Sequence, residues 1–322
     1  MTVAGGVRPR VAVCVVTYNH ARYIEDCLLS VLSQAVDADV SIIVGDDGST
    51  DGTSDLIVRL DAAWPGRITH VLHSERRGPI GNYLSIIARA EGDFVAHLDG
   101  DDFWLPGKLR EQIELLERHP SAMASCTNAV VFDDSREPVG VFTNARAGLY
   151  SLDDLMRRGN FLNHSSLLYR ASQKDRILAL APPFIDYRMH AELATRGPIV
   201  FTSKTLVGYR ANATGSMLSN ANASVREAYF DAIQFAIPHL SPRARVAACV
   251  DMMRRVVFRS LRTRDIRMLA TWWARLSRAA SVPAPRFVAQ LLASVVREAS
   301  RQGVQALSGR MLGARNRVLY FR

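Results

Sequence analysis

The stretch Phe94–Lys108 has the sequence FVAHLDGDDFWLPGK and holds the strongest structural signal in the chain. A short apolar run, Phe94–Leu98, ends abruptly in the tetrapeptide Asp99–Asp102, which is typical of a buried strand that opens onto carboxylates. Three acids in four residues repel one another, so the fold needs something to neutralise them. Mg²⁺ and Mn²⁺ prefer oxygen ligands and often share them with a substrate's phosphates. The stretch therefore indicates a cation site, with a solvated acidic turn as the alternative.

Length and composition indicate a globular protein. The chain has 322 residues, of which 48% are hydrophobic and 22% charged, enough for one large domain or two smaller ones. The four cysteines are scattered, without zinc-site spacing, as expected for reduced and mostly buried thiols in the cytoplasm. No signal-peptide pattern is found at the N-terminus, and no apolar run reaches the ~18 residues of a membrane-spanning helix. We therefore expect a cytoplasmic protein.

The residues before this stretch alternate between strand and helix patterns. Apolar β-rich runs occupy 11–16, 40–44, 68–72 and 94–98, and helical periodicity separates them over 21–34, 54–60 and 80–90. Such βαβ units predict a parallel sheet with helices on both faces. Ligands of these sheets bind beyond the carboxyl ends of the strands. We therefore expect three polar clusters, 17–19, 46–49 and 99–102, to meet at one sheet edge.

Two familiar phosphate-binding loops are absent from the sequence. The first strand is not followed by G-x-G-x-x-G, and the chain contains no G-x-x-x-x-G-K-[ST]. A dinucleotide-dependent dehydrogenase and a P-loop enzyme are therefore disfavoured. Without a glycine cradle, the phosphates of a ligand would have to be held by a metal, in agreement with the carboxylate cluster.

Three segments in this order resemble a known family. They are VCVVTYNHARYIEDCLLSVLSQ, IIVGDDGSTDGT and HLDGDDFWLPGKLREQ. Together they resemble the nucleotide-diphosphate-sugar-binding half of inverting family 2 glycosyltransferases of the GT-A fold, and the resemblance covers roughly residues 10–220. It implies an α/β fold with a Rossmann-like, mostly parallel sheet sandwiched by helices, followed by an all-helical C-terminal extension.

The resemblance also implies a domain division. Residues 1–222 would form the catalytic domain, with a nucleotide-sugar-binding half over 10–120 and an acceptor-binding half over 121–222. Residues 223–322 would form a basic helical region. The function implied is metal-dependent, inverting transfer of a sugar to an acceptor hydroxyl, in the synthesis of cell-surface polysaccharide or glycoconjugate. A UDP-sugar is the favoured donor, and the acceptor would be a carbohydrate or a lipid-linked molecule.

Site residues follow by matching the family's motifs to this sequence. The nucleotide sugar would contact residues at the first strand end, in the DDGS loop, on the third helix and in the D-x-D motif: Val16, Thr17, Tyr18, Asn19, Asp47, Asn82, Asp99 and Asp101. Asp47 would bond the base, and Arg76 or Arg77 could reach the diphosphate. Asp101 and Asp99 would hold Mg²⁺ or Mn²⁺. Asp102 would either join them or hold the loop.

The acceptor half carries the expected base. The stretch FIDYRMHAELATRGPI resembles the region where inverting members place a general base, which assigns Asp186. Ile185 stands where the family usually has Glu, and Glu192 is the rival base. Asp186 as a helix cap is the structural alternative. His164 would lie on the acceptor side, or serve a structural role.

The segment GYRANATGSMLS resembles the family's Y-R-x-H segment. Asn212 stands in place of the His that can complete the metal or diphosphate site. Asparagine can coordinate or form a hydrogen bond, but it cannot act as a charged partner of the diphosphate.

Residues 223–322 carry the chain's net positive charge. They contain 18 Arg, no Lys and 5 acids, a balance of +13, whereas the first 222 residues balance to −4. Helical periodicity recurs over this region, with Trp272 and Trp273 in one apolar stripe. Two roles are open for these helices. In the first, they pack on the catalytic domain or form an oligomer; in the second, they attach peripherally to an anionic cytoplasmic membrane. Nucleic-acid binding is not expected, because no recognition motif accompanies the charge.

Two other functions remain as alternatives. A sugar nucleotidylyltransferase would need a glycine-rich, basic N-terminal loop, which TYNHARYIED does not provide. A catalytically silent sugar- or lipid-binding protein would not need the intact acids. Hydrolysis of a nucleotide sugar would separate the silent protein from a transferase.

Overall fold

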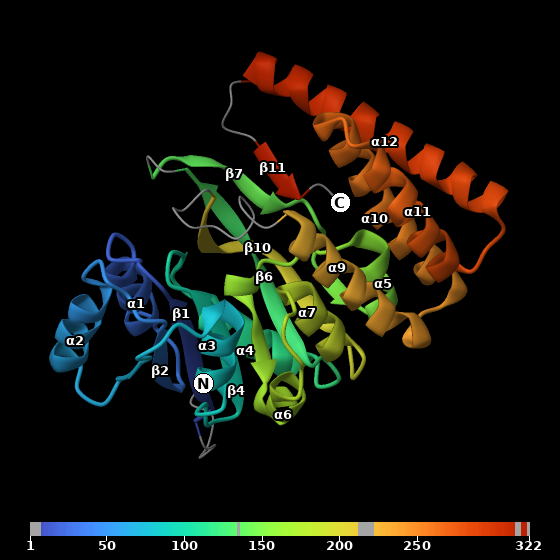
Figure 1. Ribbon diagram of the computed structural model, residues 1–322. Helices are drawn as coiled ribbons and strands as arrows, with labels where there is room; N and C mark the ends of the chain where they lie inside the picture. The colour runs from blue at the N-terminus through green and yellow to red at the C-terminus, as the bar shows by residue number, and fades with distance from the viewer. Residues whose placement is uncertain (1–7, 134–135, 212–221, 313–316, 321–322) are drawn as a thin grey trace.

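The computed structural model describes residues 8–133, 136–211, 222–312 and 317–320, and these form an α/β structure built on one mixed sheet (Figure 1). The described strands make an 11-stranded sheet with the main order β11-β7-β6-β9-β4-β1-β2-β3, and β10 attaches β5 and β8 to β6. The strands are β1 Arg10–Thr17, β2 Asp39–Asp46, β3 Ile68–Leu72, β4 Phe94–Asp99, β5 Phe103–Trp104, β6 Ala124–Phe132, β7 Pro138–Thr143, β8 Gly148–Tyr150, β9 Leu168–Arg170, β10 Ile199–Arg210 and β11 Arg317–Tyr320.

Helices cover both faces of this sheet. The N-terminal part contains α1 Ile24–Leu32, α2 Thr53–Ala63, α3 Gly78–Ile87 and α4 Lys108–Arg118. The middle part contains α5 Leu152–Arg158, the 3₁₀ turns η1 His164–Ser166 and η2 Ala171–Gln173, α6 Lys174–Leu178 and α7 Asp186–Ala194. The C-terminal part contains α9 Asn222–Ala236, the 3₁₀ turn η3 Ile237–His239, α10 Pro242–Thr263, α11 Ile266–Ala280 and α12 Ala284–Leu312.

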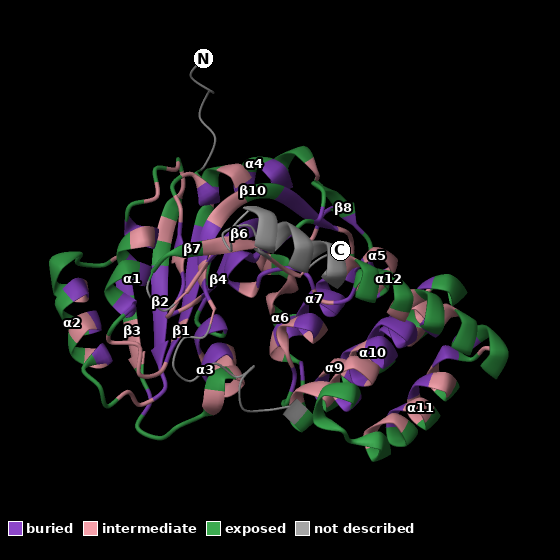
Figure 2. Cartoon of the chain, turned by 90° about the horizontal axis from the view of Figure 1, so that it is seen from above, coloured by how far each residue is buried: buried purple, intermediate pink, exposed green. Residues whose placement is uncertain are grey.

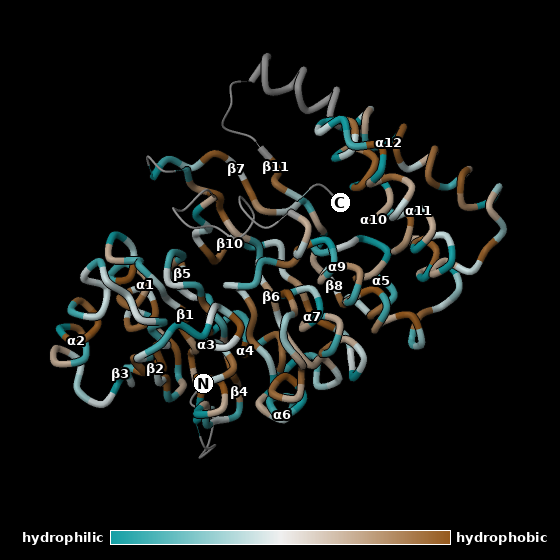
Figure 3. Tube along the Cα trace, viewed as in Figure 1, coloured by the Kyte–Doolittle hydropathy of each residue, from teal (hydrophilic) through white to brown (hydrophobic). Residues whose placement is uncertain are grey.

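Strand β1 shows how the two faces are filled. Val11, Val13 and Val15 point into the core beneath α1, α2 and α4, whereas Ala12 and Cys14 point into the core shared with α3 and α7. This is the period-2 alternation of a strand buried on both faces. Figure 2 shows the resulting buried band along β1, β2 and β4, and Figure 3 shows apolar residues concentrated on the same strands. The predicted α/β sheet is confirmed.

The four predicted N-terminal strands and the helices between them are found, with shifts of a few residues at their ends. Pairs β1–β2, β1–β4 and β2–β3 are parallel, as predicted. The sequence pattern did not identify the long strand β10. The sheet is mixed because β9 runs antiparallel to β4 and β6, and β7 runs antiparallel to β6. All four cysteines are free and buried, as expected.

The C-terminal helices pack against the α/β part. Residues of α9, α10 and α11 belong to the same core cluster as residues of α5 and α7, and β11 pairs with β7 in parallel (Figure 1). This packing agrees with the first of the two roles predicted for this region. The predicted boundary at 222/223 therefore separates segments that share one core. Trp272 is 5% exposed and packs edge-on against Phe230, so it is not free for a membrane interface.

In the described part of the chain, no single helix combines the length and apolarity needed to cross a membrane. Segments Ile266–Ala280 and Ala284–Arg301 meet that test only as a pair, bent by 112°.

Candidate functional site

The sheet register brings the three polar clusters to one edge. Val16 lies opposite Asp99, and Thr17 lies opposite Asp46, where β1 ends between β4 and β2. Two backbone hydrogen bonds extend this pairing past the strands, from Gly100 N to Val16 O at 2.8 Å and from Asp47 N to Thr17 O at 3.0 Å. The expected gathering of these clusters is confirmed.

Gly100 separates the two acids of the D-x-D motif for a steric reason. A Cβ at this position would lie 2.8 Å from Thr17 Cβ and Oγ1 and 2.9 Å from His20 Nδ1. The turn that follows β1 therefore packs directly against the D-x-D loop. Thr17 Oγ1 and His20 Nδ1 are buried there without a hydrogen-bond partner in the described structure. His20 is a site residue that the motif comparison missed, although it directly follows Asn19 in the sequence.

Tyr18 and Asp47, two of the residues predicted to bind the base, both contact Arg76. The Arg76 guanidinium lies 3.7 Å from the centre of the Tyr18 ring, and its Nε lies 3.8 Å from Asp47 Oδ2. Asp47 is 2% exposed and accepts hydrogen bonds from Arg77 N at 2.6 Å and Gly78 N at 3.0 Å. Asp47 thus anchors the start of α3. Each carboxylate oxygen can accept more than one hydrogen bond, so base binding by Asp47 stays a prediction.

The two predicted asparagines are engaged within the protein. Asn19 Oδ1 accepts from Thr50 N at 2.8 Å, which joins the turn after β1 to the loop after β2. Asn82 is fully buried; its Nδ2 donates to Gly45 O at 2.7 Å and its Oδ1 lies 3.1 Å from His73 Nε2. These contacts fit a role in supporting the strand ends better than direct contact with a nucleotide.

The three acids of the motif have different surroundings. Asp99 Oδ1 lies 3.0 Å from His97 Nε2, and its side chain is 44% exposed. Asp102 is 1% exposed, and it accepts from the Ser165 hydroxyl at 2.6 Å and from Arg210 N at 2.9 Å. These contacts match the loop-holding role, the second of the two roles predicted for Asp102. The described structure gives the Asp101 carboxylate no hydrogen bond or ion pair from another residue.

The three acids also differ in the direction in which the fold shifts their pKa values. Burial raises the pKa of Asp102 well above its ordinary value, and the nearby charges of Asp101 and Asp99 raise it further. Burial, together with the charge of Asp99, also raises the pKa of Asp101, although His20 opposes the rise. Burial opposes ionisation of Asp99 as well, but His97 and Ser165 outweigh it and lower its pKa. The mutual repulsion inferred from the sequence is therefore present in the fold.

Arg210 holds the motif from behind, and the sequence comparison did not single it out. It ends β10, and it donates through Nη1 to the backbone oxygen of Asp101 and through Nη2 to Asp26 Oδ2 at 3.0 Å. Its guanidinium also lies 4.7 Å from the centre of the Tyr23 ring. The sequence did offer a signal for this residue, because Arg210 is the arginine of the Y-R-x-H-like segment. Asn212, two residues later, lies outside the described residues.

The donor set fits a divalent cation that shares its ligands with phosphates. In the described residues, no group of three or more His, Cys, Asp or Glu side chains is arranged to hold a metal ion. Asp99 and Asp101 supply oxygen atoms only, and Mg²⁺ is commonly held by one or two carboxylates together with waters and substrate phosphates. The protein's own contribution would therefore be these two acids.

Asp46 shows how strongly this edge depends on ionised carboxylates. Its buried side chain accepts from Ser49 N at 2.9 Å and from the Ser54 hydroxyl, and it lies 3.6 Å from His70 Nε2. Burial alone raises the pKa of Asp46, but these three partners outweigh it and lower the pKa to about 2. Because the folded pKa is depressed, the stabilisation is present above pH ~4 and is lost as the pH falls towards ~2.

We therefore expect Asp46→Asn to cost about 2 kcal/mol of unfolding free energy at pH 6 and about half of that at pH 3. Urea unfolding of both proteins at the two pH values measures this difference. Asp39→Asn, at an exposed position on the same strand, should behave like the parent at both. A cost that is equal at pH 6 and pH 3 would contradict the assignment.

The predicted base, Asp186, begins α7 and is held by a side-chain amide. Asn160 Nδ2 lies 3.0 Å from its Oδ1 and 2.9 Å from its Oδ2, and Tyr187 N donates to Oδ1 at 2.7 Å. The rival, Glu192, is 7% exposed and forms ion pairs with Arg176 at 3.0 Å and Arg188 at 2.9 Å. The described hydrogen bonds of Asp186 thus come from neutral groups, whereas Glu192 is paired with two arginines. This difference favours Asp186 over Glu192 as the base.

Three histidines form a row that leads from the D-x-D motif to α7. The rings of His97 and His164 are centred 4.0 Å apart, and His164 Nδ1 lies 3.3 Å from His190 Nε2. His190 follows Asp186 by one helical turn, and His97 contacts Asp99. Burial lowers the pKa of His190 to about 4 and that of His164 well below its ordinary value, so both imidazoles are neutral at pH 7. Sequence comparison found only His164 of these three.

The C-terminal helices reach the same place through Gly159 and Asn160. Tyr229 of α9 accepts from Asn160 N at 3.1 Å through its hydroxyl and stacks on Tyr187 with ring centres 4.5 Å apart. A Cβ on Gly159, whose φ is +72°, would lie 2.6 Å from Asp251 Oδ2 and 2.7 Å from Tyr229 Oη. The residue that holds Asp186 is therefore itself held by the C-terminal region.

This contact predicts an effect of Tyr229→Phe on catalysis. Removing the hydroxyl leaves the partly buried Asn160 N–H without its acceptor, at a cost of about 1 kcal/mol. We expect turnover to fall about tenfold while nucleotide affinity is unchanged, measured by steady-state kinetics and nucleotide titration. Tyr150→Phe is the matched control, because its hydroxyl donates to a backbone oxygen, that of Arg146, at 2.6 Å. Equal turnover of the two variants would contradict the prediction.

Comparison with known families identifies the matched part of the chain. The model of glycosyl transferase family 2 matches residues 12–168, which include β1, β4 and the acid cluster. Residues 12–168 are a family 2 glycosyltransferase domain. The resemblance inferred from the three sequence segments is thereby confirmed.

Several curated proteins are similar in sequence to this chain. An uncharacterized protein of Mycobacterium tuberculosis is 30% identical over 204 residues, 62% of this chain and 58% of the relative. An uncharacterized glycosyltransferase of Nostoc is 27% identical over 227 residues, 67% of this chain and 69% of the relative. The teichuronic acid biosynthesis glycosyltransferase TuaG of Bacillus subtilis is 34% identical over 150 residues, 47% of this chain and 58% of the relative. The chain thus spans about 58% of the length of the first of these relatives.

A solved structure extends the likeness over most of the chain. Residues 1–349 of S. aureus TarS, crystallised in complex with UDP-GlcNAc, superpose with a TM-score of 0.63. The match covers 91% of this chain and 92% of that chain at 17% sequence identity. This likeness supports the fold, including the helices that follow the family 2 domain.

Proposed function

We propose that this protein is an inverting glycosyltransferase that moves a sugar from a nucleotide-diphosphate donor to an acceptor hydroxyl. One observation carries the proposal: a family 2 domain brings the Asp99–Asp101 acids to the same sheet edge as Thr17 and Asp47. That arrangement suits a diphosphate held through a cation beside a nucleoside. The neutral-donor contacts of Asp186 support its role as the base.

In the proposed mechanism the protein binds and orients the nucleotide sugar, and it removes a proton from the acceptor hydroxyl. Tyr18 and Asp47 would hold the nucleoside, and Asp99 and Asp101 would hold Mg²⁺ or Mn²⁺. When bound, the cation would neutralise the charge that develops on the leaving nucleotide diphosphate. Asp186, held by Asn160, would take the proton of the acceptor hydroxyl as its oxygen attacks the anomeric carbon. A single displacement of this kind inverts the configuration.

A UDP-sugar is the donor we propose. The similar TarS structure was solved in complex with UDP-GlcNAc, and a second TarS structure contains UDP. The acceptor we propose is a cell-surface carbohydrate or its lipid-linked precursor, since TuaG is named for teichuronic acid biosynthesis. The two alternatives, nucleotidyl transfer and a silent binding protein, receive no support from the described geometry.

Peripheral attachment to the inner membrane surface is a further part of the proposal. Because Trp272 is buried, we propose the turn between α10 and α11 as the attachment surface; Leu261 is 68% and Ile266 is 78% exposed there. Arg262, Arg264 and Arg267 are close to these residues in the sequence. Leu261→Ser together with Ile266→Ser should reduce flotation with anionic liposomes, and unchanged flotation would remove this part of the proposal.

A donor screen tests the reaction class. Full-length protein is incubated with UDP-, GDP- and dTDP-sugars, with Mn²⁺ or with EDTA, and release of the nucleoside diphosphate is measured. We expect slow, Mn²⁺-dependent hydrolysis of at least one UDP-sugar without an acceptor. Release of pyrophosphate from a nucleoside triphosphate and a sugar 1-phosphate would instead indicate nucleotidyl transfer. Binding without turnover under every condition would indicate a silent protein.

A further inference from the structure

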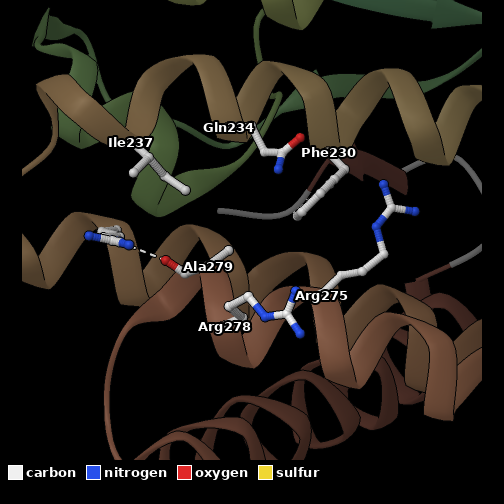
Figure 4. Close-up of a pocket in the computed structure, with 7 residues that line it drawn as sticks. Phe230, Gln234, Ile237, Arg275, Arg278 and Ala279 are labelled. Atoms are coloured by element: carbon white, nitrogen blue, oxygen red, sulfur yellow. Dashed lines mark hydrogen bonds between the residues drawn. The ribbon is translucent and has the colours of Figure 1, made fainter.

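A cavity of about 530 Å³ lies among the C-terminal helices, between α9 and α11 (Figure 4). Residues of α9 and the turn after it form one wall, and residues of α11 form the other. The cavity is lined by Phe230, Gln234, Ile237, Arg245, Arg275, Arg278 and Ala279. None of these residues belongs to the proposed transfer site.

Three arginines from two helices border this cavity. Arg245 of α10 donates through Nε to Ala279 O at 2.6 Å. Arg275 of α11 donates to both oxygens of Glu227 at 2.7 Å, and its guanidinium lies 4.4 Å from the centre of the Phe230 ring. The guanidinium of Arg278, also on α11, has no hydrogen-bond or ion-pair partner in the part of the chain that the structure describes. Arg245 and Arg275 are thus fixed in place, and Arg278 is available.

The cavity carries an excess of positive charge and of donors. Its lining residues include no carboxylate. Glu227 pairs with Arg275 from outside the lining, and Asp231 also acts on Arg275. Each guanidinium has five N–H donors, and the described hydrogen bonds use one on Arg245 and two on Arg275. Most of the donors are therefore free to bind an anion.

The number of donors favours phosphate. A carboxylate has two acceptor oxygens, whereas a phosphate offers three or four, so it can pair with the Arg278 guanidinium and still accept from a second donor. Phe230, Ile237 and Ala279 add apolar surface, and the volume exceeds that of a bare phosphate ion. We propose that this cavity binds a phosphate group carried on a larger organic molecule.

The proposed phosphate site is separated from the transfer site by helix α9. Tyr229 contacts Asn160 on one side of that helix, and the next residue, Phe230, lines the cavity on another. The cavity also lies at the opposite end of α10 and α11 from the exposed residues Leu261 and Ile266. It is therefore a second site, and the proposal stands independently of the proposed transferase activity.

Titration with glycerol 3-phosphate tests the proposal. The full-length protein is titrated calorimetrically in EDTA, so that a metal-dependent nucleotide site does not contribute, and at fixed ionic strength. We expect saturable binding that weakens at least tenfold in Arg278→Gln. Arg243→Gln is the matched control, because it removes the same charge from an exposed position near the start of α10 that does not line the cavity.

Two results would overturn the proposal. One is the absence of saturable binding by the parent protein. The other is equal weakening by Arg278→Gln and Arg243→Gln, which would indicate general attraction of anions to a basic surface. Because Arg278 is exposed and without a described partner, its replacement is not expected to change the melting temperature, and a differential scanning measurement checks this.

The source of the phosphate is distinguished by a vesicle experiment. Parent protein and Arg278→Gln are floated with phosphatidylglycerol vesicles and with phosphatidylcholine vesicles. Flotation with phosphatidylglycerol that depends on Arg278 and is competed by glycerol 3-phosphate identifies a lipid headgroup. Saturable binding of glycerol 3-phosphate without Arg278-dependent flotation identifies a soluble phosphorylated molecule. Either result supports the phosphate site.

Discussion

Replacing Asp186 with Asn is expected to slow sugar transfer by roughly 10²- to 10⁴-fold, the range attributed to a positioned general base. The amide oxygen can still accept from Asn160 Nδ2 and Tyr187 N, so the packing at the start of α7 is preserved. The reaction loses only the group that removes the acceptor's proton. Steady-state kinetics with a donor from the screen measures this loss, and nucleotide titration should show unchanged donor affinity.

Glu192→Gln is the informative comparison for this variant. Glu192 pairs with Arg176 and Arg188, so its loss leaves two arginines without their carboxylate. We expect a lower melting temperature and near-normal turnover per folded molecule. Near-normal turnover of Asp186→Asn, with nucleotide still bound, would exclude Asp186 as the base. Strong loss of turnover in Glu192→Gln at an unchanged melting temperature would transfer the role to Glu192.

Replacing Asp101 with Asn is expected to remove most of the metal-dependent affinity for nucleotide. Loss of an outer-shell partner already costs roughly 10- to 100-fold in metal affinity, so loss of a direct carboxylate ligand should cost about 100-fold or more. Calorimetric titration with UDP, with and without Mn²⁺, measures the effect. Asp101 is suited to this test because the described structure gives its carboxylate no competing hydrogen bond.

Asp102→Asn separates a ligand from a loop support. Asp102 accepts from Ser165 and Arg210, and we expect its replacement to lower the melting temperature while the Mn²⁺ dependence of UDP binding persists. If Asp101→Asn keeps the parent's Mn²⁺ dependence, the metal assignment is wrong. If Asp102→Asn loses that dependence while remaining as stable as the parent, Asp102 is a ligand as well.

The nucleotide-side half of the fold was accessible from sequence because its signals are local. Each strand of that half is a short apolar run, and each polar cluster directly follows its strand. The parallel order of β1, β2 and β4 then fixes which residues meet, as the pairing of Val16 with Asp99 shows. Strand β10 was missed because its pairing depends on β6, far away in the sequence, and its alternation is interrupted by register shifts.

The residues that support the candidate site could not be predicted from the sequence in the same way. Asn160 and Tyr229 carry no motif, and their importance arises only because α9 packs on α7. His97 and His190 look like ordinary residues of a strand and a helix, and only the tertiary fold places them on either side of His164. Asp47 and Asn82 were assigned by motif, but their backbone partners could not be inferred from a pattern of residue types.

The contact between Tyr229 and Asn160 also bears on the order in which the protein assembles. Tyr229 lies on α9, which begins at Asn222, whereas the three polar clusters of the nucleotide edge all precede Phe103 in the chain. During synthesis, N-terminal segments are made first and can fold before later ones. During synthesis the nucleotide edge can form while α9 is still absent. We therefore expect a growing chain to bind donor before it gains the support that transfer requires.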